Sequence, residues 1–491
     1  MTKIKFPNGL SEDIVRRISA AKHEPDWMLQ VRLDAYHQFI NMPMPKFGPK
    51  LDIDFDSICY YATPTDQPTD RWDDLPRDIK NTYDQIGLPE AEKRYLAGVG
   101  AQYDSGVVYQ NLKAEWENLG VIFLDTDTGL QKYPDLFKRF FGKVIPARDN
   151  KFAALNTAVW SGGSFIYVPP HVQLTIPLQA YFRINIANLG QFERTLIIAD
   201  ENAEVQYVEG CTAPIYSTDS LHAAVVEVVA MPGSRVRYTT IQNWSTNVIN
   251  LTTQRMLVQK DAVGEWIDGN IGSKITMKYP SVILAGEGAR GDILSMAVAK
   301  GTQNQDNGGK AIHLAPNTSS TIVSKSISLD GGVCSYRGKI KIAPNAANAK
   351  TSTKCDALLM DSTSVSNTFP TNDIHRSDAE IAHEATVSKV SEEQLFYMMS
   401  RGLSEDEATG MIVNGFMEPI VKNLPMEYAV ELNRLIDMSM EGSVGWANKS
   451  IKLLRASLAK NTWLRLTKIA VLTYALFMIS LILHRIFLSW S

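Results

Sequence analysis

The chain has 491 residues and carries 53 acidic and 49 basic side chains, which gives a formal net charge of −4. With 45% hydrophobic and 21% charged residues, the composition is that of a folded protein and excludes a wholly disordered chain. The length leaves room for about two or three domains, and the slight negative charge gives no reason to expect nucleic acid as a partner.

The first 150 residues are predicted to form a mostly helical region. Ser11 is a candidate N-cap, and residues 25–40 carry apolar side chains at helical spacing. A third candidate helix covers residues 75–87. Residues 46–72 are rich in proline and aspartate, which predicts irregular structure. No apolar signal segment opens the sequence, so no secretion signal is expected.

Residues 151–375 are predicted to form a β-rich core. Short β-branched runs alternate with turn residues, and the turns recur at steps of 26–32 residues, near Asp200, Pro232, Asp261, Glu287, Pro316 and Pro344. A loose period of this size with short strands favours a parallel β-solenoid, so the expected fold class is mainly β. A β-sandwich is the alternative that the pattern leaves open.

Helical spacing returns in residues 376–445. Ser391 with Gln394, and Ser404 with Glu407, fit capping boxes, and Gly402 is a candidate helix stop. A third helix is predicted to begin at Pro425. The apolar faces of these helices are wide enough to pack on the solenoid or on another protein.

The tail, residues 446–491, differs from the rest of the chain. It contains seven Lys or Arg residues and no Asp or Glu, and residues 469–483 form an apolar run. The run is shorter than the roughly 20 residues that span a bilayer, and residues 466–490 reach that length only with His484 and Arg485 at the far interface. A membrane-associated helix and a helix docked on a partner both fit this pattern.

A candidate metal site involves Cys355, His383 and Glu384. Thiolate, imidazole and carboxylate groups all bind iron or zinc, but these three cannot complete the ligands of an iron–sulfur cluster. Such a site would be open or completed by a second subunit. The alternative is a buried cysteine and a solvated His–Glu pair before a helix. No second histidine follows His383 at i+4, so a zinc protease is excluded.

The other cysteines are widely spaced, and no C-x-x-C pair exists, so free thiols in a reducing compartment are expected. Cys211 lies between Gly210 and Pro214, which predicts an exposed turn where a thiol could accept sulfur as a persulfide or remain inert. Glu209 is expected to raise the pKa of Cys211. Cys59 and Cys334 are interpreted as packing residues. The sequence has no P-loop, dinucleotide-binding fingerprint or esterase elbow, and no catalytic residue is predicted.

Several segments, in order over roughly residues 80–445, resemble SufB, the scaffold subunit of the SUF iron–sulfur cluster assembly system. They are EAEKRYLAGVGAQYDSGVVY, FLDTDTGL, VPPHVQLTIPLQAYFRIN, YVEGCTAP, CDALLMD, HEATVSKVSEEQLFYMMSRGL, IVNGF and LPMEYAVELNRLIDMSMEGSVG. The resemblance implies a right-handed parallel β-helix between helical regions. It also implies a scaffold that is not itself an enzyme, with ATP hydrolysed by the partner SufC.

The resemblance implies residue roles where the motifs match. Cys355 corresponds to the cysteine of nascent cluster assembly, with Glu384 as its carboxylate partner and His383 beside it. Cys211 corresponds to the acceptor of sulfur from the desulfurase machinery. The polar residues that match the route between the two thiols are Arg183, Gln242, Trp244 and Lys260. Ordinary packing inside a β-helix is the alternative for these four.

The resemblance also implies partners. The helices of residues 391–442 match the SufC-binding region, and SufD or a second SufB is expected to pair through the β-helix. A cysteine desulfurase and a sulfur-transfer protein would supply sulfur, the cargo would be a transient iron–sulfur cluster, and reduced flavin (FADH2) is associated with such complexes. The expected location is the cytoplasm or plastid stroma. The tail departs from the family pattern and leaves open both membrane contact and an extension without function.

Two functions of other classes remain as alternatives. A carbohydrate-active β-helix enzyme needs convergent carboxylates, for which Asp261, Glu265, Asp268 and Glu287 are available, although they are expected at turns without pairing. The second alternative is a membrane-tethered interaction platform without metal chemistry.

Overall fold

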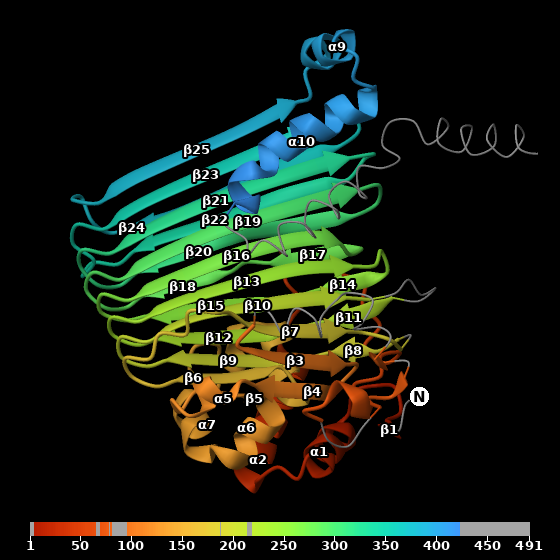
Figure 1. Cartoon of the computed structure of the whole chain (residues 1–491), viewed down its shortest axis with the longest axis vertical. Coiled ribbons are helices and arrows are strands. Elements are labelled where there is room, and N and C mark those ends of the chain that lie inside the picture. The colour runs from red at the N-terminus through yellow and green to blue at the C-terminus, as the bar shows by residue number, and fades with distance from the viewer. Residues whose placement is uncertain are drawn as a thin grey trace, which may run out of the picture.

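The computed structural model describes residues 4–64, 69–77, 79–80, 96–186, 188–213 and 219–422. Its core is a parallel β-solenoid, in which a 10-stranded sheet and a 13-stranded sheet face each other (Figure 1). The predicted solenoid is therefore confirmed, and the β-sandwich alternative is wrong. In Figure 1 the strands stack from the N-terminal helices at the bottom to α9 and α10 at the top.

The first sheet has the order β25-β23-β21-β19-β16-β13-β10-β7-β3-β4, and neighbouring strands are parallel except for β3 and β4. Its strands are β3 (Gly98–Tyr103), β4 (Gly106–Leu112), β7 (Leu178–Arg183), β10 (Glu204–Thr212), β13 (Arg235–Trp244), β16 (Val263–Gly272), β19 (Arg290–Lys300), β21 (Ser319–Leu329), β23 (Lys350–Leu359) and β25 (Glu380–Lys389).

The second sheet forms the opposite wall of the solenoid. Its strands are β5 (Ile122–Asp125), β6 (Ser164–Val168), β8 (Gly190–Gln191), β9 (Arg194–Ala199), β11 (Ser220–His222), β12 (Val225–Ala230), β14 (Val248–Asn250), β15 (Thr253–Val258), β17 (Ile275–Lys278), β18 (Ser281–Leu284), β20 (Asn304–His313), β22 (Val333–Ile342) and β24 (Val365–Ile374). A separate small pair joins β1 (Ile4–Lys5) to β2 (Ala62–Thr63).

The turns that the sequence predicted recur at one corner of the solenoid. Asn202, Asp261 and Asn317 adopt positive φ there, and Gly233 and Gly288 do so in the turns between them. Main-chain hydrogen bonds connect successive turns, for example from Asn202 N to Pro232 O at 2.9 Å. Residues that tolerate the left-handed conformation therefore fix the period of the fold.

The N-terminal region contains the expected helices and several strands that the sequence did not indicate. Ser11 caps α1, as predicted, by accepting a hydrogen bond from Ile14 N at 3.3 Å. The helices are α1 (Glu12–Ala21), α2 (Asp26–Asn41), η1 (Trp72–Asp74), α5 (Ala114–Glu117), α6 (Thr126–Lys132), α7 (Pro134–Phe140), η2 (Ala147–Asp149) and α8 (Lys151–Val159). Most of the predicted helix at 75–87 lies outside the described residues.

Two C-terminal helices follow the solenoid, α9 (Glu392–Ser400) and α10 (Glu405–Val421). Ser391 caps α9, and Ser404 with Glu407 forms a full capping box on α10. Gly402 has φ of +98°, as its predicted role as a helix stop requires. The helix expected at Pro425 and the tail lie outside the described residues.

One face of α10 is anchored on the outer surface of the first sheet. Val413, Met417 and Ile420 are buried there against apolar side chains of the strands. Figure 1 shows α10 lying across the strands, with α9 beyond the last turn. Within the described part of the chain, no helix has the length and apolar character that crossing a membrane takes.

Candidate functional site

The interior of the solenoid contains a line of polar side chains that ends at Cys355. Because the strands of the first sheet pair in register, inward side chains at one level form columns along the solenoid axis. One of these columns, which we call the polar column, consists of Glu209, Thr240, Asp268, Ser295, Ser324 and Cys355. All of its members are buried.

Cys211 lies inside the solenoid at the start of this column. It belongs to β10, is only 2% exposed, and donates from Sγ to Glu209 Oε1 at 3.6 Å. The predicted exposed turn is therefore wrong, because β10 continues through Gly210 and Cys211 to Thr212. Burial, reinforced by Glu209, raises the pKa of Cys211 well above the ordinary value of a thiol.

Glu209 is an ionisable group placed to exchange a proton near neutral pH. Burial, together with the nearby Glu193 carboxylate, raises the pKa of Glu209 to about 7. The Tyr238 hydroxyl donates to its Oε2 at 2.5 Å. Glu193 itself lies 2.5 Å from His222 Nε2; burial disfavours the charged imidazole, but Glu193 outweighs this effect and raises the pKa of His222.

Two of the four residues expected along a sulfur route lie in the interior. Gln242 is paired in register with Cys211, and Trp244 follows it on the same face of β13. Gln242 Oε1 accepts hydrogen bonds from Asn250 at 2.6 Å and from Trp244 at 3.4 Å. Its Nε2 is buried and, within the described residues, has no partner.

Arg183 and Lys260 occupy different places. Arg183 ends β7 and pairs with Thr212, so it is one position out of phase with the inward residues Phe182 and Cys211. Lys260 is exposed at the turn between β15 and β16, where its carbonyl accepts from Gly233 N. The structure therefore places neither side chain in the interior beside Gln242.

A buried ion pair crosses the middle of the solenoid. Lys278 of β17 lies 2.5 Å from Asp268 of the polar column, and both side chains are at most 1% exposed. Lys278 begins a second inward column on the opposite wall, which continues through Asn307 and Tyr336 to Thr368. The two columns meet again at their far end, where Thr368 is hydrogen-bonded to Cys355.

Many polar atoms in this interior have no protein partner among the described residues. Buried atoms of this kind are Thr240 Oγ1, Asn270 Oδ1, Thr276 Oγ1, Ser295 Oγ, Tyr336 OH and Thr353 Oγ1. Buried polar groups normally have a hydrogen-bond partner, and unsatisfied ones cost about 1–3 kcal/mol each. The arrangement is therefore suited to water or a small polar cargo between the two columns.

Cys355 lies one strand away from the end of the first sheet. It is 3% exposed, and burial raises its pKa to about 11, which the hydrogen bond to Thr368 partly opposes. The thiol is therefore protonated at neutral pH in the isolated chain. Because a metal binds the thiolate, iron at this position has to displace a proton.

The two other expected ligands lie on β25 and not directly before a helix as predicted. His383 is in register with Thr353 and so faces the same side as Cys355. Glu384 is in register with Lys354, lies 3.3 Å from its Nζ, and faces the opposite side. Among the described residues, no group of three His, Cys, Asp or Glu side chains could hold a metal ion.

Among the described residues, nothing covers the end of the solenoid beside Cys355. Within this part of the chain, strand β25 pairs with β23 alone, and all ten of its residues are exposed. Large apolar side chains are exposed on β24 and β25, namely Val365, Phe369, Ile381 and Val387. Unprotected edge strands of this kind pair readily with another chain.

The carboxylates of the carbohydrate-enzyme alternative do not converge. Asp268 faces the interior, whereas Glu265 lies on the outer face of β16 and is paired with Arg237 at 3.0 Å. Asp261 and Glu287 lie at turns, as expected. No two of these four carboxylates flank a common groove in a way that sugar cleavage requires.

The polar column was missing from the sequence predictions, although a signal for it exists. Its six members are 27–31 residues apart, which is the same period as the turns. Aligning the repeats on their turns and reading only alternate positions would have found Thr240, Asp268, Ser295 and Ser324. Lys278 carries no comparable signal, because its strand is short and belongs to the other wall.

Two family models match this chain. The SUF system FeS cluster assembly SufBD core domain matches residues 182–416, and the SufBD protein N-terminal region matches residues 104–180. An iron-sulfur cluster assembly SufBD family protein of Staphylococcus saprophyticus is 59% identical over 438 residues, which cover 89% of this chain and 94% of the relative. Proteins of the same description from Staphylococcus aureus strains USA300 and MRSA252 match with the same identity and coverage. The chain therefore belongs to the SufBD family of iron–sulfur cluster assembly proteins of the SUF system.

Proposed function

We propose that this chain is a SufB-type scaffold that receives sulfur at Cys211 and builds a nascent iron–sulfur cluster at Cys355. The observation that carries the proposal is the polar column, which starts beside one thiol and ends at the other. An ordinary solenoid interior is apolar, and a row of buried carboxylates and hydroxyls is costly unless it serves a function.

The distance between the thiols determines the form in which sulfur travels. Five strand spacings separate β10 from β23 in the first sheet, which amounts to roughly 24 Å. Direct exchange between Cys211 and Cys355 is therefore impossible without a large rearrangement. Sulfur has to leave Cys211 as a small species, for which hydrosulfide is the simplest choice.

Cys211 accepts and releases sulfur in two steps. Glu209 takes the proton of the Cys211 thiol, the resulting thiolate attacks the outer sulfur of a persulfide on the donor protein, and the donor thiolate leaves. Two electrons and one proton then convert the Cys211 persulfide into the thiol and hydrosulfide. The electrons come from an external two-electron reductant, for which reduced flavin is our candidate, and Glu209, with its pKa of about 7, is placed to exchange the proton.

The interior polar groups lower the cost of holding the anion. Lys278 offers a buried positive charge, and the unpartnered Gln242 Nε2 offers a hydrogen-bond donor. Charge-assisted hydrogen bonds of this type are about twice as strong as neutral ones. At the far end, two hydroxyl groups lie next to Cys355. Ser324 is paired with it in register, and Thr368 is hydrogen-bonded to it.

Replacement of Cys211 by alanine is the experiment that tests this proposal. With a cysteine desulfurase and its sulfur-transfer protein as the source, cluster yield in anaerobic reconstitution is expected to fall at least tenfold. With free sulfide as the source, the yield should match the unmodified protein, because Cys355 is intact. Equal loss with both sulfur sources would refute the assignment of Cys211 as the sulfur acceptor.

A second subunit is proposed to close the open end of the solenoid. Cys355 and His383 offer too few ligands for a cluster, and Glu384 needs β25 to move before it can join them. A partner strand that pairs with β25 would cover the exposed apolar residues and bring further ligands. SufD and a second copy of this chain both fit this role.

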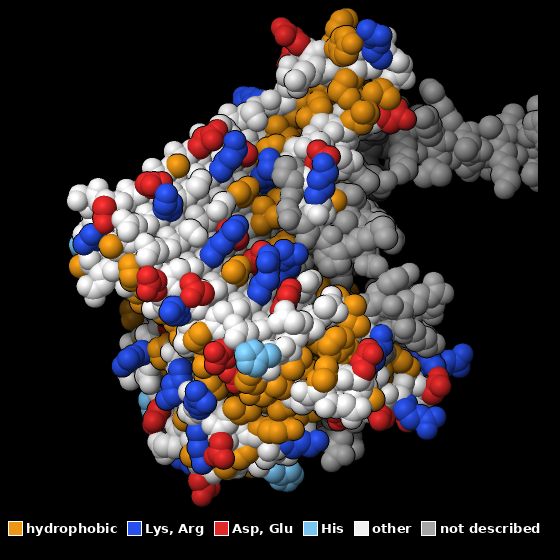
Figure 2. Space-filling model, turned by 60° about the vertical axis from the view of Figure 1, so that its left-hand side comes forward, with side chains coloured by type: hydrophobic (Ala, Val, Ile, Leu, Met, Phe, Trp, Pro, Cys, Tyr) orange, Lys and Arg blue, Asp and Glu red, His pale blue; other side chains and the backbone are white. Residues whose placement is uncertain are grey.

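The C-terminal helices are proposed to bind the ATPase SufC. Phe396 and Tyr397 of α9 are 75% and 58% exposed, and Figure 2 shows hydrophobic side chains gathered over α9 and α10 at the top of the molecule. An exposed apolar patch on helices of this kind marks an interaction site. We further propose that this unit covers residues 376–445, beside the core of residues 151–375 and the N-terminal region of residues 1–150.

Replacing both Phe396 and Tyr397 by serine is expected to abolish co-purification with SufC. The fold should be unaffected, because neither side chain is buried. Ile40, which is 55% exposed on α2 at the other end of the molecule, provides the matched control, and Ile40→Ser should retain SufC. Normal recovery of SufC with the double variant would contradict the placement of this surface.

A further inference from the structure

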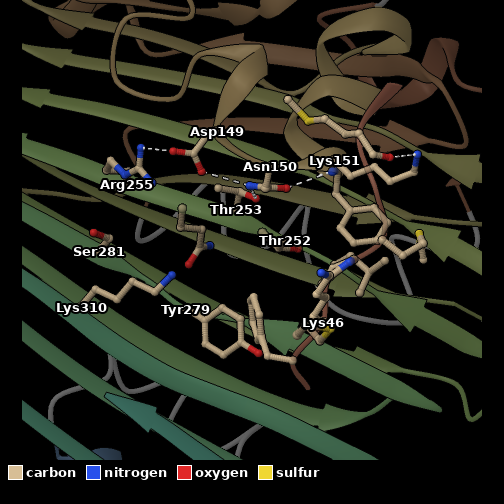
Figure 3. A pocket seen from close by; sticks show the side chains of 18 of the residues that line it. Lys46, Asp149, Asn150, Lys151, Thr252, Thr253, Arg255, Tyr279, Ser281 and Lys310 are labelled. Atoms are coloured by element: carbon tan, nitrogen blue, oxygen red, sulfur yellow. Dashed lines mark hydrogen bonds and ion pairs between the residues drawn. The ribbon is translucent and has the colours of Figure 1, made fainter. Parts of the chain in front are cut away.

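A cavity of about 500 Å³ lies on the outer face of the second sheet, away from the polar column (Figure 3). The segment that follows α2 and the start of α8 enclose it against strands β15, β17 and β20. Its size is typical of sites that hold a small organic ligand. None of the residues assigned to sulfur transfer or cluster assembly contributes to it.

The walls of the cavity combine aromatic and aliphatic side chains. Phe47 and Tyr279 lie on one side with ring centroids 6.2 Å apart, and Met42, Met44 and Phe152 complete the apolar lining. The Tyr279 hydroxyl donates to Asp306 at 2.8 Å, which holds the ring in place. Such walls would accept a planar ring.

Positive charges outnumber negative ones around the same cavity. Two of the four lining cations are already engaged: Lys151 donates to the carbonyls of Phe39 and Met42, and Arg255 is paired with Asp149 at 2.7 Å. Lys46 is exposed at the rim. Asp149 is the one carboxylate in the described lining.

Lys310 is a partly buried cation that has no ion pair within the described residues. It is half-buried, and within the described residues its Nζ has no carboxylate partner and lies 5.0 Å from the centre of the Tyr279 ring. Burial and the neighbouring charge of Arg255 lower its pKa; the nearby Asp149 carboxylate opposes this shift, but Asp149 is already paired with Arg255. Figure 3 shows Lys310 beside Tyr279 and on the same side of the hollow as Arg255.

We propose that this cavity binds a small phosphomonoester with a planar ring, of the size of a mononucleotide. The phosphate would pair with Lys310, with support from Arg255, and the ring would lie against Phe47 and Tyr279. A doubly charged phosphate fits a group of cations that a single carboxylate does not neutralise. A lysine binds phosphate as a point charge and needs no bidentate geometry.

The test is titration calorimetry on the full chain with AMP and with 4-nitrophenyl phosphate as probes. Adenosine supplies a ring without phosphate, and inorganic phosphate supplies the charge without a ring. Saturable binding of at least one ring-bearing phosphate, at least tenfold tighter than adenosine and inorganic phosphate, is expected. Absence of saturable binding by both probes, or equal affinity for inorganic phosphate, would overturn the proposal.

Lys310→Met provides the matching variant, because methionine keeps the length of the side chain and is tolerated in a half-buried position. Its thermal unfolding midpoint without ligand should equal or exceed that of the unmodified protein, whereas binding should weaken at least tenfold. Lys339→Met is the control: Lys339 is exposed on the neighbouring strand, close enough to influence Lys310 but outside the cavity lining. Equal weakening in both variants would show a non-specific charge effect and refute the site.

Discussion

Replacing Cys355 by alanine is expected to abolish cluster formation while the protein remains folded. Cys355 is the thiol at which the polar column ends, and a nascent cluster at this end of the solenoid has no other thiolate from the described part of the chain. Anaerobic reconstitution with iron and sulfide, followed by visible absorption and iron and acid-labile sulfide analysis, measures the loss.

The chain offers a closely matched control for this variant. Cys334 on β22 is also buried, at 2% exposure against 3% for Cys355, but it packs against Ala297 and Ala299 and belongs to neither interior column. Cys334→Ala should therefore give normal cluster yield. A normal yield in Cys355→Ala, or an equal loss in both variants, would contradict the assignment of the assembly thiol.

Replacing Lys278 by methionine is expected to destabilise the fold by about 3–5 kcal/mol. The change leaves the Asp268 carboxylate buried at 1% exposure without its counter-ion, and removing one partner of a buried pair exposes the full cost of the remaining charge. Urea unfolding at pH 7, followed by circular dichroism, measures the difference in the free energy of unfolding.

The double variant Lys278→Met, Asp268→Asn separates stability from function. It removes both charges and should recover most of the lost stability, since replacing a buried pair by neutral groups is often close to neutral. If the buried cation helps hydrosulfide to pass, the double variant should still give a lower cluster yield from the desulfurase. Full recovery of both stability and yield would show that the pair serves packing alone.

The fold could be predicted because the turn residues recur along the sequence with the repeat length of the solenoid. Asp261 and its equivalents need left-handed backbone, so Asn, Asp and Gly recur at one corner of each coil and give the repeat length. The strands β3 and β4 were missed because the glycines of β3 and the apolar run that opens β4 obscure the alternation that marks a strand. A short run of this kind does not show whether it forms a strand until the strands that pair with it are known.

The candidate site was only partly predictable, because side-chain direction depends on register. Adjacent residues of a strand face opposite sides, so His383 and Glu384 could not both point toward Cys355 once they lie on β25. An irregular segment before a helix would have allowed both to do so, and the sequence did not distinguish the two cases. The exposed turn predicted for Cys211 failed for a similar reason, since glycine is tolerated inside a strand where space is limited.

The charged side chains of the interior show a second limit of prediction from the sequence. His222 and Lys278 come from the second sheet, and Glu193 lies between β8 and β9; they meet Glu209 and Asp268 only after two walls of the solenoid close on each other. Contacts of this kind connect residues on strands that are not paired with each other. Periodicity gives the repeat length, but it does not show which column of one wall faces which column of the other.

The most direct test of the account follows labelled sulfur through the chain. The protein is incubated anaerobically with the desulfurase system and ³⁵S-labelled cysteine. One sample, without reductant, is unfolded, alkylated and mapped by peptide mass spectrometry; a second, with iron and reductant, is analysed for labelled acid-labile sulfide. The account predicts a labelled persulfide at Cys211 in the first sample, and labelled acid-labile sulfide in the second that is lost in both Cys211→Ala and Cys355→Ala. Labelled acid-labile sulfide that is undiminished in Cys211→Ala would contradict a path that begins at Cys211 and ends at Cys355.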